Sequence, residues 1–179
     1  RGNPMNKLNS LRAHLLANLP ELKHDPERLL IFVDQGRIRA TAAPGLSFEY
    51  SYTLNIILTD YTGSPDAVAV PLLAWVLVNQ SELMTNHEKS KEAIQFEVDV
   101  IDENQVDMSL TMPLTERVIV KRLDDGTLQI THPQEPQYTE QLPATPMQLI
   151  ADGEVLSSWT SAEPTGVDIE TPQPGQSRG

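Results

Sequence analysis

The stretch LSFEYSYTLNIILT, residues 46–59, decides the fold because its apolar residues recur at every second position. One face of this stretch would carry Phe48, Tyr50, Tyr52, Leu54, Ile56 and Leu58, and the other Glu49, Ser51, Thr53 and Asn55. Such alternation is the pattern of a β-strand with one buried face. The sequence therefore predicts one long strand whose polar face is open to water or to another chain.

Two stretches predict helices that cover the apolar face of this strand. Leucines recur at helical spacing in residues 6–19, and Pro20 blocks continuation of that helix. Residues 67–79 are apolar almost all round, with Trp75 near the middle, as in a buried core helix. Pro71 lies inside this second stretch, and proline is best tolerated in the first turn of a helix, so a start near Val70 is preferred.

Three hairpins are predicted around the long strand. Residues 29–33 and 37–40 flank a turn at 34–36, and residues 94–100 and 106–112 alternate around an acidic turn. Residues 117–123 and 128–131 form the third hairpin, while Pro113 is expected to interrupt the strand before it. Residues 80–93 are predicted to be a loop. The resulting fold is α+β, an antiparallel sheet of about five to seven strands with two packed helices.

The chain divides into a core and an arm. Residues 1–4 precede Met5 and are interpreted as a remnant of recombinant expression, so the core domain is predicted over 5–131. Residues 132–179 contain seven of the 14 prolines and mostly acidic charge, which predicts an extended C-terminal arm. A short hairpin at 147–159 is too small to bury its own apolar face and should dock elsewhere. Its docking residues would be Met147, Leu149, Ile150, Val155, Leu156 and Trp159.

Composition limits the function. The chain has 25 Asp plus Glu against 13 Lys plus Arg, and a net charge of −12 disfavours stable binding to nucleic-acid phosphates. The lack of cysteine fits a reducing compartment and excludes thiol nucleophiles and thiolate zinc sites. No apolar run approaches the roughly 20 residues of a membrane span, and no signal sequence follows Met5, so assembly in the cytoplasm is expected.

No group of residues predicts an active site. The histidines lack the spacing of metal ligands, and there is no phosphate loop, nucleophile elbow or dinucleotide fingerprint. A minor alternative is a hydrolase or nuclease that holds a divalent ion with the carboxylates of one hairpin tip, against the simpler interpretation of a solvated acidic turn. Those carboxylates are Asp99, Asp102, Glu103 and Asp107. The prediction is a protein that is not an enzyme and needs no cofactor or metal.

Four strings, taken in order, resemble the tail completion protein R family of contractile-tailed temperate phages and related prophages. They are PERLLIFVDQGRI at 26–38, SFEYSYTLNIILTDY at 47–61, VPLLAWVLVNQSELM at 70–84 and SLTMPLTERVIVKR at 109–122. The resemblance extends over residues 5–146 and rests on the series as a whole, since no single string carries a chemical fingerprint.

The resemblance implies a structural virion protein at the head-proximal end of the tail, where it ends tube and sheath polymerisation and prepares the tail to join a head. Similarity to tail terminators implies a homo-oligomeric ring, a hexamer, that caps the tube. The implied partners are tube and sheath proteins and neck or connector proteins, with DNA only as passing cargo and no membrane. An acidic lumen would repel that DNA and reduce sticking. The alternative is a head–tail joining or neck connector protein of the same virion.

A closed ring joins different surfaces of identical chains. The polar face of the long strand and the basic residues of the first predicted hairpin are expected to meet the neighbour. These candidate interface residues are Arg37, Arg39, Glu49, Ser51, Thr53 and Asn55.

Overall fold

The computed structural model describes residues 5–40, 45–86, 90–136 and 144–161, so much of the predicted arm lies outside the described residues. Its helices are α1 (Asn6–Asn18), α2 (Pro65–Asn79) and α3 (Glu82–Thr85), with short 3-10 turns at Pro20–Lys23 and Pro26–Arg28. Its strands are β1 (Leu29–Ala40), β2 (Phe48–Tyr61), β3 (Gln95–Val100), β4 (Val106–Arg122), β5 (Leu128–Thr131), β6 (Pro146–Ala151) and β7 (Glu154–Thr160).

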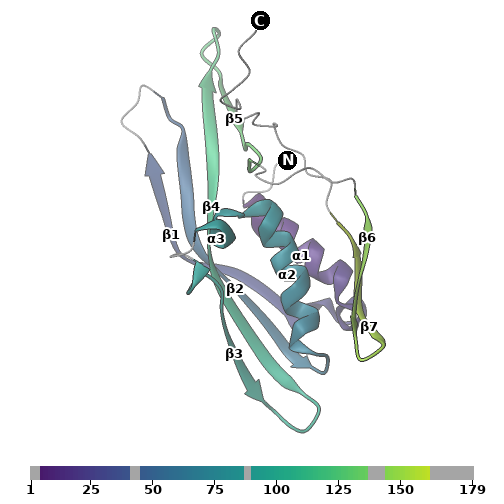
Figure 1. Cartoon of the computed structure of the whole chain (residues 1–179). Helices are drawn as coiled ribbons and strands as arrows, with labels where there is room; N and C mark the ends of the chain where they lie inside the picture. Colours follow the sequence, from purple (N-terminus) through teal and green to yellow (C-terminus); the bar gives the residue numbers. More distant parts are fainter. Residues whose placement is uncertain (1–4, 41–44, 87–89, 137–143, 162–179) are drawn as a thin grey trace, which may run out of the picture.

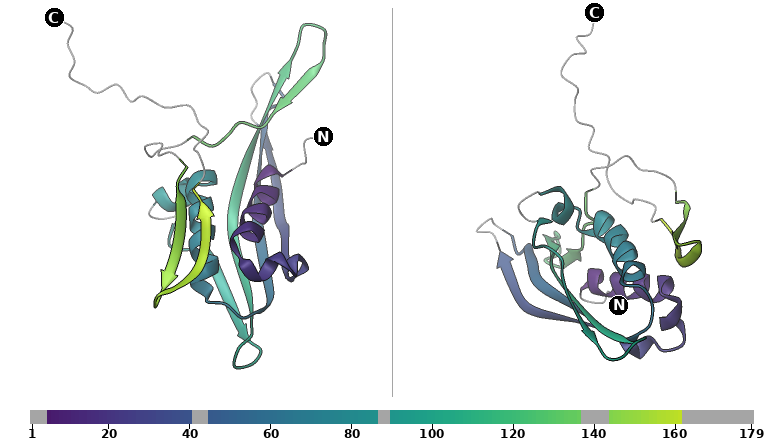
Figure 2. Two further views of the ribbon diagram at one scale, coloured as in Figure 1. Left: turned by 90° about the vertical axis from the view of Figure 1, so that its right-hand side faces the viewer. Right: turned by 60° about the horizontal axis from the view of Figure 1, so that its bottom comes forward.

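The predicted α+β fold is confirmed. The main sheet is antiparallel, with strand order β1-β2-β4-β3 and with β5 added beside the far end of β4. Helices α1 and α2 cover one face of this sheet, and the separate β6–β7 hairpin lies beyond the helices (Figures 1 and 2). No helix in the described part of the chain is long and apolar enough to cross a membrane.

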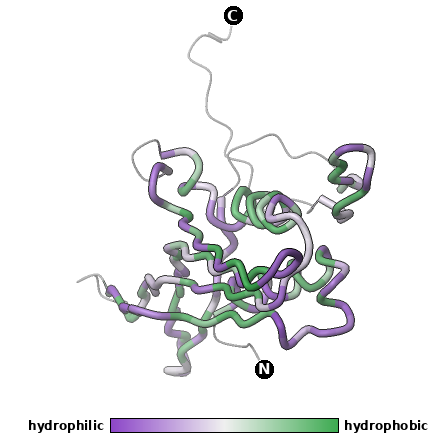
Figure 3. Tube along the Cα trace, turned by 90° about the horizontal axis from the view of Figure 1, so that it is seen from below, coloured by the Kyte–Doolittle hydropathy of each residue, from purple (hydrophilic) through white to green (hydrophobic). Residues whose placement is uncertain are grey.

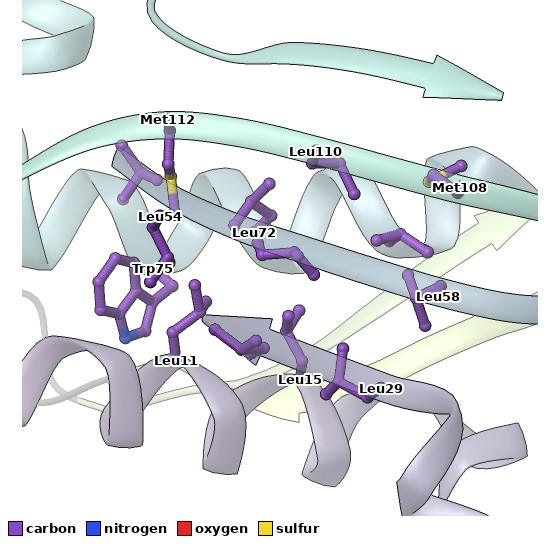
Figure 4. Packing of buried hydrophobic residues seen from close by; sticks show 14 of the residues in the cluster. Leu11, Leu15, Leu29, Leu54, Leu58, Leu72, Trp75, Met108, Leu110 and Met112 are labelled. Atoms are coloured by element: carbon purple, nitrogen blue, oxygen red, sulfur yellow. The ribbon is translucent and has the colours of Figure 1, made fainter. Parts of the chain in front are cut away.

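The core lies between the sheet and the two helices. Leu11 and Leu15 of α1 point at Leu54 and Leu58 of β2, while Trp75 of α2 closes one end of the layer (Figure 4). Hydrophobic and hydrophilic residues alternate along the strands, which gives the sheet one buried and one open face (Figure 3). The long strand predicted at 46–59 is therefore confirmed as β2.

The first predicted hairpin is wrong. Residues 29–40 form one strand, β1, and both of its halves pair with β2. The register shifts between Asp34 and Arg37, where Gln35 has a φ of 51°. The Asp-Gln-Gly sequence therefore makes a β-bulge instead of a turn, because the 14-residue β2 is long enough to pair with both halves.

Pro113 does not interrupt its strand, contrary to the prediction. Thr115, two residues on, donates its N–H to Gln80 Oε1 at 3.2 Å, on the side of β4 away from β2. Residues two apart direct their amides to the same side, so the missing donor of Pro113 also falls there. On that side the β3–β4 pairing stops at Gln95 and Thr111, so the proline removes no ladder bond.

Helix α2 begins at Pro65, earlier than the preferred start near Val70. Ser64 caps it, because its Oγ accepts the Asp66 N–H at 3.2 Å, and Pro65 occupies the first turn. The earlier start buries Ala67 and Val68 against the core, which offsets the hydrogen bond lost at Pro71. The predicted loop at 80–93 also contains α3, because Leu83 adds a buried anchor.

Candidate assembly surfaces

The open face of the main sheet collects all six candidate interface residues. Cross-strand partners share a face, and Arg37 lies opposite Ser51 while Arg39 lies opposite Glu49. Thr53 and Asn55 continue the same row along β2. The structure therefore brings these residues together on the face that α1 and α2 leave uncovered (Figure 2).

Glu49 lies between two arginines on this open face. Arg39 Nη2 lies 2.9 Å from Glu49 Oε1, and Arg117 of β4 is the residue opposite Glu49 on its other side. The Arg39 side chain is 78% exposed, so solvent screens the pair and its contribution to stability is small. Arg39 and Arg117 therefore both lie exposed on this face, on the two sides of Glu49.

Asn55 forms a recessed polar point at the middle of the open face. Its Nδ2 is buried and has no hydrogen-bond partner within the described residues. A hollow of about 340 Å³ lies beside it, lined in part by Asp34, Thr53 and Thr111. A buried amide without a hydrogen-bond partner is unfavourable. The Asn55 side chain therefore carries an unsatisfied N–H donor on the open face.

The β6–β7 hairpin docks on helices of its own chain. Ser157 is 2% exposed, and its Oγ donates to the Asn18 carbonyl at the end of α1 at 2.7 Å. The predicted docking residues Leu149, Leu156 and Trp159 are half-buried. The other three, Met147, Ile150 and Val155, remain 43%, 57% and 56% exposed. One side of the hairpin thus packs against the helices, and the apolar residues Met147, Ile150 and Val155 stay exposed.

A buried polar network joins α1 to the sheet and to the residues that follow β5. Lys7 Nζ donates to Gln80 Oε1 at 2.6 Å, to the Thr115 carbonyl at 2.7 Å and to Glu135 Oε1 at 2.7 Å. Gln80 donates in turn to Glu82 at 2.8 Å and to Thr115 Oγ1 at 3.1 Å. Burial lowers the pKa of Lys7, although Glu135 opposes this shift. A cleft of about 320 Å³ lies beside the network.

Glu116 anchors the start of α1. Met5 and Asn6 supply no side-chain cap, and the Glu116 carboxylate instead accepts the backbone N–H groups of Asn6 at 3.1 Å and Lys7 at 3.4 Å. Tyr52 donates its hydroxyl hydrogen to the same carboxylate, and burial together with this bond raises the pKa of Tyr52. A negative group at a helix N-terminus is stabilised by the helix dipole.

Sequence reasoning missed this network. A signal for Glu116 was present, because it falls in phase with the buried residues Met112, Leu114 and Val118 of β4. A carboxylate at such a position needs a partner in the core. The identity of that partner, the first turn of α1 more than 100 residues earlier, has no signal in the local pattern.

The acidic residues near the β3–β4 turn are arranged as a solvated turn. Asp99 and Asp107 lie opposite each other on the open face, and Asp107 Oδ1 accepts the Asp60 N–H at 2.9 Å. Asp102 Oδ1 accepts the N–H groups of Asn104 and Gln105. Within the described residues no group of three or more histidines, aspartates or glutamates has a geometry that could hold a metal ion.

Comparison with known proteins gives the family. No solved structure matches the chain. The chain is 43% identical over 156 residues to the protein named tail completion protein R of Escherichia phage P2, covering 87% of this chain and 99% of that protein. The family model described as P2 phage tail completion protein R (GpR) matches residues 5–136. The chain therefore belongs to the P2 phage tail completion protein R family.

Proposed function

We propose that this chain is a structural component that completes a phage tail. The observation that carries this proposal is the 43% identity to tail completion protein R of phage P2 across 99% of that protein's length. The uncovered sheet face supports the proposal, because a subunit held only by neighbouring subunits needs a broad surface that its own helices leave free.

In finer detail, we place the protein at the head-proximal end of the tail, as a homo-oligomeric ring that caps tube and sheath. A hexamer follows the symmetry suggested by similarity to tail terminators. In this ring the row from Arg37 to Asn55 faces a neighbour, and the exposed part of the β6–β7 hairpin is available to tube, sheath or neck proteins. The action is mechanical and uses no catalytic group or cofactor.

The test is complementation of a phage that lacks the corresponding gene. Electron microscopy should show tails of irregular length or without a closed end in the absence of the protein, and finished tails after its addition. Tagged protein should bind isolated tails and not isolated heads. Binding to heads alone would overturn the proposal in favour of a neck connector, and normal tails in the gene's absence would exclude a role in completion.

Matched variants locate the contact surface. Glu49→Lys with Thr53→Lys should abolish complementation and leave the far-ultraviolet circular dichroism spectrum unchanged, because both side chains lie on the open face. The control is His24→Lys with Glu27→Lys, two exposed residues between α1 and β1 that belong to neither proposed contact surface and that give the same change in charge. Equal loss of complementation in both variants would contradict an interface on the open face.

A further inference from the structure

The two ends of β4 carry opposite charge on the open face of the main sheet. We call the region around the last residues of β4 the basic end. Its cationic residues on the open face are Arg37, Arg39, Arg117 and Lys121. We call the region around the first residues of β4 the acidic end. Its carboxylates are those of Glu97, Asp99 and Asp107 on the open face and of Asp102 and Glu103 in the β3–β4 turn. β4 has 17 residues, so the two ends are about 50 Å apart at ~3.3 Å per residue.

The positive charges at the basic end are only partly neutralised by acidic residues of the same chain. Glu49 pairs with Arg39, and Asp124 and Asp125 occupy the β4–β5 turn. Neither Arg117 nor Lys121 forms an ion pair in the described part of the chain. In a chain with a net charge of −12, this concentration of cations on one surface is unexpected.

Both ends also expose apolar residues on the opposite face, the one that carries the helices. At the acidic end, Phe96 and Val100 of β3 are 68% and 75% exposed, because the helices do not cover the edge strand. At the basic end, Leu128 and Ile130 of β5 are 50% and 62% exposed on the hairpin that projects beyond the helices (Figure 1). Each end therefore has one charged face and one apolar face.

Both ends finish in a strand edge that has no partner among the residues that the structure describes. Within these residues β3 pairs only with β4, and β5 pairs only with the other end of β4. Open strand edges accept further backbone hydrogen bonds, so an unprotected edge is a surface for another chain. These two edges, with apolar residues on one face and opposite charges on the other, are complementary to each other.

We propose that the β4–β5 end of one copy binds the β3–β4 end of a second copy. This inference rests on the proposed ring and adds a contact between strand edges of neighbouring copies to the one proposed at the row from Arg37 to Asn55. In this arrangement Lys121 and Arg117 face the carboxylates of the acidic end, while Leu128 and Ile130 cover Phe96 and Val100. The contact is heterologous, so its repetition builds a closed ring if the rotation between copies closes.

Chemical cross-linking of the purified protein tests the contact, because the natural chain has no cysteine. Gln129→Cys places a thiol beside Lys121, and Asn104→Cys places one in the acidic turn; both sites are exposed. A short bis-maleimide should join the two variants into a mixed dimer when they are combined. Neither variant alone should form a dimer. The control is Gln148→Cys, an exposed residue of β6, which should not cross-link to Asn104→Cys.

Charge exchange tests the electrostatic part. Lys121→Glu in the Gln129→Cys partner should reduce the mixed dimer by about tenfold, and Asp99→Lys in the Asn104→Cys partner should restore it. If the free protein is monomeric, the same pairs are cross-linked in tails assembled in infected cells. Absence of the mixed dimer in both settings, or dimers of Gln129→Cys with itself, would overturn the head-to-tail contact.

This result is separable from the proposed function. A mixed dimer in solution without any effect on tails would retain the contact and reject tail completion. Complementation without the mixed dimer would retain tail completion and reject this contact. A mixed dimer unaffected by Lys121→Glu would show that the charged face is not part of the contact and would overturn the proposal in its present form.

Discussion

Lys7 Nζ lies 2.7 Å from Glu135 Oε1, an ion pair between residues 128 positions apart that ties the first turn of α1 to the segment after β5. The Lys7 side chain is 10% exposed, so the pair compensates a cation that is mostly removed from water. The family model also extends to residue 136, past the predicted core boundary at 131. We propose that the folded core includes residues 132–136.

This boundary is testable by truncation. A chain that ends at Pro136 keeps the Lys7–Glu135 pair, whereas a chain that ends at Thr131 leaves Lys7 with fewer partners. The shorter chain should unfold with a free energy lower by about 1–3 kcal/mol, because a buried charge has lost its counter-ion. Urea unfolding followed by tryptophan fluorescence measures the difference, since Trp75 lies in the core. Equal midpoints for the two chains would place the boundary at 131.

Replacement of Glu116 should destabilise the protein more than replacement of a surface glutamate. Glu116→Gln removes the negative charge that accepts the Asn6 and Lys7 N–H groups and the Tyr52 hydroxyl. The expected loss is about 2–3 kcal/mol, which lowers the melting temperature by roughly 4–12 °C. Calorimetry of Glu27→Gln, at an exposed site, provides the control. A similar melting temperature for both variants would show that α1 does not depend on this cap.

Gly63 is required by the side chains packed around it. A Cβ there would lie 2.5 Å from the hydroxyl oxygen of Tyr61, a residue that is 3% exposed and packed in the hydrophobic core. Gly63→Ala should lower the free energy of unfolding by about 1–3 kcal/mol through overpacking. Gly36→Ala is the matched control, because no atom lies within 4 Å of a Cβ at that position. Thermal unfolding should separate the two variants, and identical curves would contradict the packing argument.

His14 should make the fold sensitive to mild acid. Burial lowers the pKa of His14 from its ordinary 6.5, and the hydrogen bond to the Pro71 carbonyl at 2.9 Å only partly opposes this shift. As the pH falls to 6.5 and lower, His14 takes up its proton more readily in the unfolded chain than in the folded chain. The free energy of unfolding therefore falls as the pH drops through 6.5.

Unfolding in urea at about pH 7.5 and about pH 5.5 measures this effect. His14→Gln retains a neutral donor and should lose less stability over that interval than the natural chain. His24→Gln, at an exposed turn residue, should behave like the natural chain. If His14→Gln loses as much stability as the natural chain, another group controls the acid response.

The local pattern of the sequence was enough to predict the main elements. Alternation over residues 46–59 and leucines at helical spacing in residues 6–19 report directly which side of each element is buried. The open face and the four polar residues that β2 places on it follow from that period, since a strand with one apolar side must leave the other side to solvent or a partner. The position of Arg37 and Arg39 beside them depends on the pairing of β1 with β2. The hairpin at 147–159 was visible for the same reason.

Long-range pairing decided the rest. The bulge at Asp34 to Arg37 and the passage of β4 through Pro113 depend on which strand lies alongside, and local sequence favoured a turn and a break at these places. The Lys7 network and the cap from Glu116 join residues more than 70 positions apart. The opposite charges at the two ends of β4 likewise become a surface only when β1, β2 and β3 are placed beside it. The repeat of apolar residues along a strand or helix determines which face a residue lies on, because that repeat follows from backbone geometry. The residues that it contacts across the fold depend instead on how the strands and helices pack together.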